Sequence, residues 1–211
     1  MPVYKKGKIN ANSYWCMWEI TESLEQLEQN VILSEESKEE LSLVHHPTKR
    51  KESLASRRCL QEIFKDLGES YYGIVKDEYN KPHLVGHKYH ISISHSSPFA
   101  VAILHKKLPV GIDIEKPQDK LLKVAPRFLN NWEYEDAGED INKLCVYWAG
   151  KEAIYKLKGK RNLSFREDIR IAPFDLVKRD VIKSEFRAGK KFSKIALNYW
   201  EIKGNYIVFC F

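Results

Sequence analysis

The sequence predicts an α+β protein made of two similar halves. An amphipathic helix is expected over residues 48–67 and another over 140–158, and a glycine, the usual helix-ending residue, follows each of them. Short strands follow each helix, and each half closes on an apolar strand, at 99–104 and at 206–211. Identity between the halves is slight, so the similarity lies in the order of the elements.

The first half begins with a strand at 14–20, where bulky apolar residues are frequent. An acid-rich helix is expected at 34–43, with Ser34 as its N-cap. The helix at 48–67 ends at Gly68. The strands expected after it are 71–75, 83–85, 90–94 and 99–105.

A short basic turn with a proline, at 106–109, separates the halves. We therefore expect domains at 1–106 and 107–211. The second half should contain helices at 121–128 and 140–158, the latter ended by Gly159. Its expected strands are 110–115, 168–172, 181–186, 194–202 and 206–211.

Composition favours a cytoplasmic globular protein. The longest apolar run, 99–104, is far too short to span a bilayer, and the first residues lack the apolar core of a signal peptide. The four cysteines are scattered without metal-ligand spacing, which favours buried, reduced thiols.

The segment 110–115 reads Val-Gly-Ile-Asp-Ile-Glu and is expected to be an acidic strand. Because strand side chains alternate, Gly111, Asp113 and Glu115 share one face. Carboxylates two residues apart, about 6–7 Å along a strand, can hold one hard cation from the same side. We expect Gly111 to leave room for a bulky ligand. The alternative is a solvated acidic strand edge.

The helix over 140–158 continues its apolar stripe with charges. Spacings of three and four residues connect Ile141, Leu144, Cys145 and Trp148. The same stripe then reaches Glu152 and Lys156. Buried charge is costly unless it is paired or binds metal, so a Mg²⁺ site for phosphate chemistry is one interpretation. The other is an ordinary helix ion pair, worth ~0.3–0.5 kcal/mol.

Much of the formal net charge of +6 lies on the helix over 48–67. Its cations are Lys49, Arg50, Lys51, Arg57 and Arg58. They could be a solvated face, or they could bind phosphates or an acidic partner. Nucleic-acid binding is less favoured because interleaved aromatic residues are missing.

The acidic strand and the motif Trp-x-x-Lys-Glu-Ala at 148–153 together resemble the paired signature of the 4′-phosphopantetheinyl transferases. The single-chain, surfactin-synthetase-activating branch fits best. Ile-Ser-Ile-Ser-His-Ser at 91–96, Asn-Lys-Pro at 80–82 and the segment 50–57 resemble further motifs of this family, in the same order. Asn80 stands where glycine is usual. The motifs extend from Lys49 to Lys160.

The resemblance implies a pseudo-twofold α+β pair of subdomains, each a small antiparallel sheet packed with a long helix. The N-terminal subdomain would bind coenzyme A and the C-terminal one the metal. The implied reaction is Mg²⁺-dependent transfer of 4′-phosphopantetheine from coenzyme A to a serine of an apo acyl or peptidyl carrier protein. The products would be the holo-carrier protein, as used in fatty acid, polyketide or nonribosomal peptide synthesis, and 3′,5′-ADP.

The resemblance also assigns roles to residues. It makes Asp113, Glu115 and Glu152 the metal ligands, and Lys156 the contact to a phosphate oxygen that stabilises or protonates the departing 3′,5′-ADP. The coenzyme A contacts that it implies, Arg57 foremost among them, are Arg50, Arg57, Lys81, His95, Ser96 and Lys151.

Glu133 lies in a segment similar to one that brings an acid near the acceptor serine in this family. It could instead be an ordinary glutamate at a helix N-terminus. The sequence leaves Glu152, Glu133 and a metal-held water as candidates to accept the serine proton. We expect the neighbouring Phe128 and Leu129 to form an apolar contact for a carrier-protein helix.

Two rival functions stay open. Acidic pairs with a lysine also serve Mg²⁺-dependent nucleases and phosphodiesterases, and the basic helix could make the chain a non-catalytic nucleic-acid-binding module. The ordered motifs favour the transferase, with an acidic carrier protein as partner and no nucleic acid or membrane. Since one chain would supply both halves, we expect a monomer.

Overall fold

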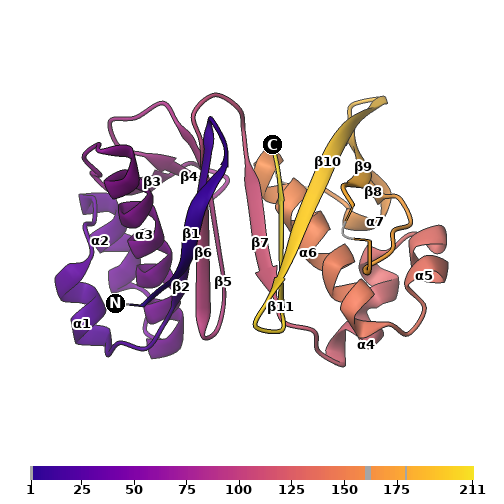
Figure 1. The fold of residues 1–211 in the computed structure, drawn as a ribbon, viewed down its shortest axis with the longest axis horizontal. Coiled ribbons are helices and arrows are strands. Elements are labelled where there is room, and N and C mark those ends of the chain that lie inside the picture. The colour runs from indigo at the N-terminus through magenta and orange to yellow at the C-terminus, as the bar shows by residue number, and fades with distance from the viewer. Residues whose placement is uncertain (1, 160–162, 179) are drawn as a thin grey trace. The chain divides into compact units, whose positions relative to one another are not determined.

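The computed structural model describes residues 2–159, 163–178 and 180–211 and shows an α+β protein (Figure 1). Its internal contacts divide the chain into two compact units, Met1–Val110 and Gly111–Phe211. Sequence analysis placed the boundary after residue 106. Each unit contains an antiparallel sheet and one long helix, as expected.

The first unit is built on a four-stranded antiparallel sheet in the order β1-β2-β6-β5. A separate two-stranded sheet, β3-β4, is formed by the residues between α3 and β5. The strands are β1 Val3–Asn10, β2 Ser13–Glu19, β3 Ile74–Lys76, β4 Pro82–Leu84, β5 His90–Ser96 and β6 Phe99–His105. The helices are α1 Leu24–Asn30, α2 Glu35–Ser42 and α3 Pro47–Leu67.

Helix α3 is the centre of the first unit, because both of its sides are covered. One side packs on the sheet through residues such as Cys59 and Ile63. The other side contacts α1 and α2, where Leu54 joins Leu27 and Leu41 in a separate cluster. Gly68 ends the helix at φ 69°, as its sequence position predicted.

Two elements of the first unit escaped sequence analysis. Strand β1 is largely exposed and rich in lysine, so it lacks the apolar alternation of a half-buried strand. Lysines on an edge strand discourage pairing with another chain. Helix α1 is short, and its start is fixed by a capping box between Ser23 and Gln26.

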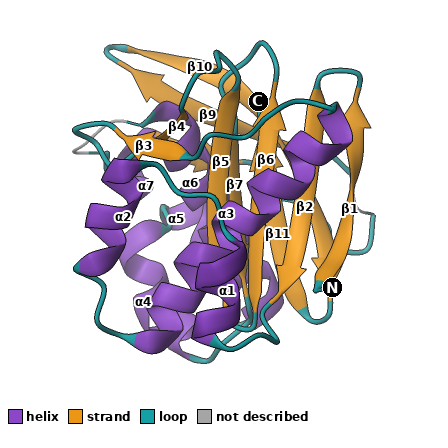
Figure 2. Ribbon diagram, turned by 90° about the vertical axis from the view of Figure 1, so that its left-hand side faces the viewer, coloured by secondary structure: helices purple, strands orange, loops and turns teal. Residues whose placement is uncertain are grey.

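The second unit is a five-stranded antiparallel sheet in the order β7-β11-β10-β9-β8. Helix α6 lies along it (Figures 1 and 2). The strands are β7 Gly111–Glu115, β8 Ile169–Ile171, β9 Ile182–Ala188, β10 Lys191–Ile202 and β11 Asn205–Cys210. The helices are α4 Lys120–Phe128, α5 Asn131–Ala137, α6 Ile141–Lys158 and α7 Phe165–Asp168. Sequence analysis missed α5 and α7.

Helix α6 is buried on most of its circumference rather than on a single stripe. The charges that the sequence placed on its buried face, Glu152 and Lys156, lie with Trp148 along a half-buried margin. They are therefore shielded on one side and accessible on the other.

Gly111 brings β7 into direct contact with the backbone of α6. A Cβ atom at this position would lie 1.9 Å from the Ala153 carbonyl oxygen and 2.9 Å from the Leu157 nitrogen. The expectation that Gly111 leaves room for a ligand is therefore wrong, because the helix backbone fills that space. Asp113 and Glu115 share this strand face, so their side chains leave the strand towards α6.

The four cysteines are buried free thiols, as expected. Among the described residues, no helix combines the length and the apolar character needed to cross a bilayer.

We predict that Gly111→Ala lowers the free energy of unfolding by about 3 kcal/mol, because the added methyl group forces β7 and α6 apart. Denaturant unfolding measures the change. Gly7→Ala is the matched control: its new Cβ would have only Trp15 Nε1 nearby, at 3.9 Å, so its effect should stay within about 0.5 kcal/mol. Equal stability of both variants would contradict the close approach.

Candidate functional site

Four charged residues from β7 and α6 form the candidate active site in the second unit. Lys156 Nζ lies 2.7 Å from Asp113 Oδ1, in an ion pair whose carboxylate is almost fully buried. Glu115 Oε1 accepts a hydrogen bond of 3.0 Å from the indole Nε1 of Trp148. Sequence analysis placed Trp148 in the apolar stripe and missed this hydrogen bond, although the motif contains the residue.

The carboxylates of this site repel one another. Burial raises the pKa of the Glu152 carboxyl to about 7, and the nearby Asp113 charge adds to the rise. Burial also raises the pKa of Glu115, again with a contribution from Asp113. Lys156 opposes both shifts. The three carboxylates therefore sit close enough to feel each other, with excess negative charge that a bound cation would relieve.

The donor chemistry fits Mg²⁺, which takes hard oxygen ligands. Within the described ranges, no three acidic, histidine or cysteine side chains already stand in an arrangement that could hold a metal. In this conformation the Lys156 ammonium supplies the counter-charge for Asp113. Mg²⁺ commonly takes only one or two carboxylates, with waters and substrate phosphates completing its shell. Asp113, Glu115 and Glu152 are thus suitable ligands, and their role stays a prediction.

We predict that Glu152→Gln stabilises the metal-free protein at neutral and higher pH. A folded pKa near 7, above the unfolded value, means that stability falls as pH rises from about 4.3 to 7. The uncharged variant escapes this loss, on the order of 3 kcal/mol above pH 7, and matches the wild type below about pH 4.

Chemical unfolding across this pH range, with a chelator present, measures the effect. Glu135→Gln, at an exposed glutamate of α5, controls for the loss of one charge. A Glu152→Gln variant no more stable than wild type at pH 8 would contradict the buried-charge account.

Glu133 and Lys151 form a fully buried ion pair, with 2.7 Å between Lys151 Nζ and Glu133 Oε2. The same ammonium donates to the carbonyl oxygens of Phe165 and Ile169, at 2.7 and 2.9 Å. Glu133 also accepts from the backbone nitrogens of Asn130 and Ile171. Burial lowers the pKa of Lys151 and raises that of Glu133, so each charge depends on its partner.

This pair fastens the end of the sheet. Strand β8 is an edge strand, and Glu133 and Lys151 bind its Ile171 N–H and Ile169 carbonyl. The pair therefore satisfies edge groups and ties α5, α6 and β8 together. In this structure neither side chain reaches the surface, because both are fully buried. The binding role that the resemblance implied for Lys151 and the proton-accepting role that it implied for Glu133 stay predictions, and the contacts seen here are structural.

We predict that Lys151→Met lowers the free energy of unfolding by about 3–5 kcal/mol, because it leaves Glu133 as a buried charge without its partner. The matched control is Lys38→Met, which removes an exposed ion pair with Glu35 and should cost less than about 1 kcal/mol. Calorimetry compares the two. If Lys151→Met kept full stability, the pair would not be structural.

In the first unit, a buried carboxylate positions His95. The imidazole Nδ1 lies 3.2 Å from Glu52 Oε2 of α3, whose side chain is almost fully buried. Lys49 binds the same oxygen at 2.8 Å. A carboxylate on one ring nitrogen fixes the ring's orientation. Neighbouring Ser96 ends strand β5 and is half-buried.

Lys81 follows a tight turn between β3 and β4. Asn80 has φ 63°, a left-handed conformation that glycine favours and asparagine tolerates, which explains its place in the family's glycine position. Asp77 Oδ1 accepts hydrogen bonds from the backbone nitrogens of Tyr79 and Lys81 and holds the turn.

The cations of α3 are used within the first unit. Arg57 is almost fully buried and binds Glu40 of α2 at 3.2 Å and Ser53 Oγ at 2.6 Å. Arg50 pairs with Glu28 of α1 at 2.7 Å. These arginines face the helices that cover α3. In this structure both arginines bind groups of the first unit, so the coenzyme contacts expected of Arg57 and Arg50 stay predictions.

The apolar contact expected at Phe128 and Leu129 is also wrong, because both side chains belong to the core and are no more than 3% exposed. Exposed apolar side chains nearby are Leu122, Trp132 and Tyr134. All of these residues lie near Glu133 in the sequence, so this proximity could not show which apolar side chains are buried and which are exposed.

The acidic strand, the α6 motif and the antiparallel α+β fold are features of one superfamily. Residues 109–210 match the model of the 4′-phosphopantetheinyl transferase superfamily. This segment, just under half of the chain, is therefore similar to that superfamily.

Curated relatives bear the same name. The chain is 34% identical over 76 residues to the 4′-phosphopantetheinyl transferase Sfp of Bacillus subtilis strain 168, an alignment that covers 34% of each chain. A second Bacillus subtilis 4′-phosphopantetheinyl transferase is 34% identical over 39% of each chain. The 4′-phosphopantetheinyl transferase gsp of Aneurinibacillus migulanus is 33% identical, over 40% of this chain and 37% of its own. The alignments thus span little more than a third of these relatives.

Proposed function

We propose that this protein transfers the 4′-phosphopantetheine group of coenzyme A to a serine hydroxyl of an apo acyl or peptidyl carrier protein, with Mg²⁺. The observation that carries the proposal is the cluster of Asp113, Glu115, Glu152 and Lys156 between β7 and α6, within the segment that matches the superfamily. Mg²⁺ held by the three carboxylates would neutralise charge on the pyrophosphate.

In the proposed step, the serine oxygen bonds to the phosphorus that carries the pantetheine arm. The bond from that phosphorus to the bridging oxygen of the pyrophosphate breaks, and 3′,5′-ADP leaves with the electron pair. Lys156 stabilises or protonates the leaving phosphate. Its ammonium donates to the Asp113 carboxylate, and a carboxylate oxygen is the same type of acceptor as a phosphate oxygen, which supports this role.

The serine proton needs an acceptor. Glu133 is poorly suited, because both of its oxygens bind buried donors. Glu152 is only partly buried and belongs to the carboxylate cluster. We therefore assign the proton to Glu152 or to a water that it binds.

For the coenzyme we propose contacts from His95, Ser96 and Lys81 of the first unit. The Glu52 carboxylate supports this role for His95, because it fixes the orientation of an exposed imidazole that could contact a phosphate. We propose that one chain is the active unit, as expected from the sequence.

Mass spectrometry tests the function directly. An apo carrier protein incubated with the protein, coenzyme A and Mg²⁺ should gain the mass of one phosphopantetheine group. We predict that Asp113→Asn and Lys156→Met each reduce the rate at least about a hundredfold, since each removes a charge used in transfer. Lys38→Met, an exposed lysine, is the control. An unmodified carrier protein, or near-wild-type rates in both variants, would sink the proposal.

We predict that Glu52→Gln raises the KM for coenzyme A about tenfold but changes that for 3′-dephospho-coenzyme A much less, because the loss falls on a phosphate contact of His95. Steady-state kinetics with both substrates separates a lost contact from general damage. Glu62→Gln is the control, because it also removes a buried carboxylate of α3 that binds lysines. Equal losses with both substrates would mean that Glu52 serves the fold alone.

A further inference from the structure

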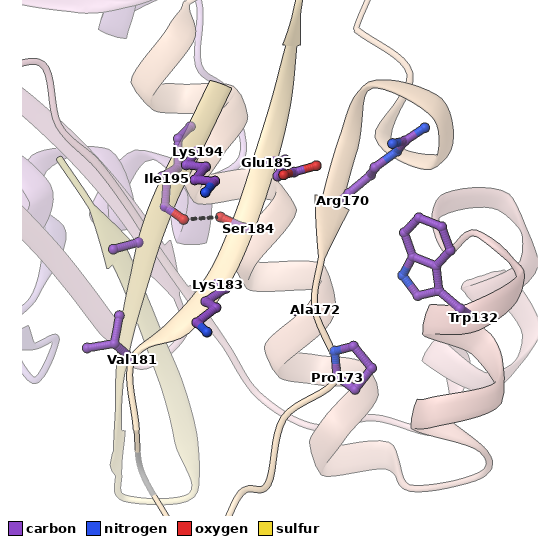
Figure 3. Close-up of a pocket in the computed structure, with 11 residues that line it drawn as sticks. Trp132, Arg170, Ala172, Pro173, Val181, Lys183, Ser184, Glu185, Lys194 and Ile195 are labelled. Carbon is purple, nitrogen blue, oxygen red and sulfur yellow. Dashed lines mark hydrogen bonds between the residues drawn. The ribbon is translucent and has the colours of Figure 1, made fainter. Parts of the chain in front are cut away.

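A cavity of about 660 Å³ lies in the second unit, over strands β8, β9 and β10 (Figure 3). None of its lining residues belongs to the cluster of Asp113, Glu115, Glu152 and Lys156. Its apolar lining consists of Trp132, Ala172, Pro173, Val181, Ile195 and Ala196. In Figure 3, Trp132 and Pro173 lie on one side and Val181 on the other. A volume of this order suits a small ligand.

The charged side chains of the cavity come from the outward face of the sheet. Arg170 lies between buried Ile169 and Ile171 of β8, so strand alternation turns it away from the core. Strand register places Glu185 beside both Arg170 and Lys194. Lys183 precedes Glu185 by two residues on β9, so the two side chains share one face of the strand. The cavity therefore has three cations and one carboxylate.

The aromatic wall is held in place. The Arg170 guanidinium carbon lies 5.6 Å from the Trp132 ring centroid and 3.9 Å from that of Phe192. Cation–π contacts of this kind fix the orientation of the indole. Trp132 remains 45% exposed, which is unusual for a large aromatic side chain and leaves its ring available to a ligand.

The two lysines keep their charge available. Within the part of the chain that the structure describes, neither Lys183 nor Lys194 forms an ion pair. Apolar walls beside an excess of positive charge are complementary to a molecule with an apolar body and an anionic head. The lysines would repel a cationic ligand, and a neutral apolar ligand would form no ion pair with them.

We propose that this cavity binds an alkyl carboxylate, with the alkyl chain against Trp132, Pro173 and Val181 and the carboxylate at Lys183 and Lys194. The proposal is independent of the transfer reaction, because it uses none of the residues assigned to that reaction. A failure of one leaves the other intact.

Titration with decanoate, followed by NMR on the full chain, tests the proposal. The Trp132 indole signal, assigned from its loss in Trp132→Phe, should shift saturably together with amides of β8, β9 and β10. Decyl phosphate tests whether any anionic head suffices. Decyltrimethylammonium, with the same chain and the opposite charge, should bind at least about tenfold more weakly, a difference of about 1.4 kcal/mol.

Variants separate the cavity from general adsorption. Lys183→Glu with Lys194→Glu should weaken decanoate binding at least about tenfold, whereas Lys5→Glu, on exposed β1, should not change it. Ala196→Trp, at an exposed position of the cavity floor, should fill the space and abolish the shifts. The proposal is overturned if the Trp132 signal does not shift or does not saturate with decanoate. It is also overturned if decyltrimethylammonium binds as tightly as decanoate, or if decyl phosphate binds more tightly than decanoate. Unchanged decanoate binding in both cavity variants would overturn it as well.

Discussion

The contact between the backbones of β7 and α6 at Gly111 is the constraint on which the second unit depends. Only a residue without a side chain lets the helix come this close, since any Cβ would overlap the Ala153 carbonyl oxygen. The same strand face then carries Asp113 towards α6, and the ion pair with Lys156 forms one helical turn beyond that contact. A packing requirement thus sets the geometry of the charged site.

Charge serves two different purposes within one turn of α6. Lys151 is fully buried, pairs with Glu133 and closes the edge of the sheet. Glu152, the next residue, points about 100° away around the helix and joins the acidic cluster, where burial and repulsion raise its pKa to about 7. The Lys151 ammonium donates to three acceptors, the Glu133 carboxylate and the carbonyl oxygens of Phe165 and Ile169, which favours stability. The second is poorly satisfied in the metal-free protein, which is a common cost of functional sites.

The sequence predicted the long helices, their terminal glycines and most strands, because apolar periodicity and helix-ending residues are local signals. It missed β1, which is polar, and α1, α5 and α7, which are too short for a clear period. The sequence also predicted the strand and the helix that bring Asp113 and Lys156 together, because both segments have local signals. The ion pairs of Arg57 with Glu40 and of Lys151 with Glu133 were not predicted, because a sequence does not show which face of a helix another element covers.

A crystal structure with coenzyme A and Mn²⁺ in place of Mg²⁺ tests most directly the proposal that the carboxylates of β7 and α6 hold a metal ion. The account predicts one anomalous peak bound by Asp113, Glu115 and Glu152 and by a pyrophosphate oxygen, with the Lys156 ammonium moved from Asp113 to a phosphate oxygen. A metal bound elsewhere, or a coenzyme bound while the pair of Lys156 and Asp113 stays closed, would contradict it.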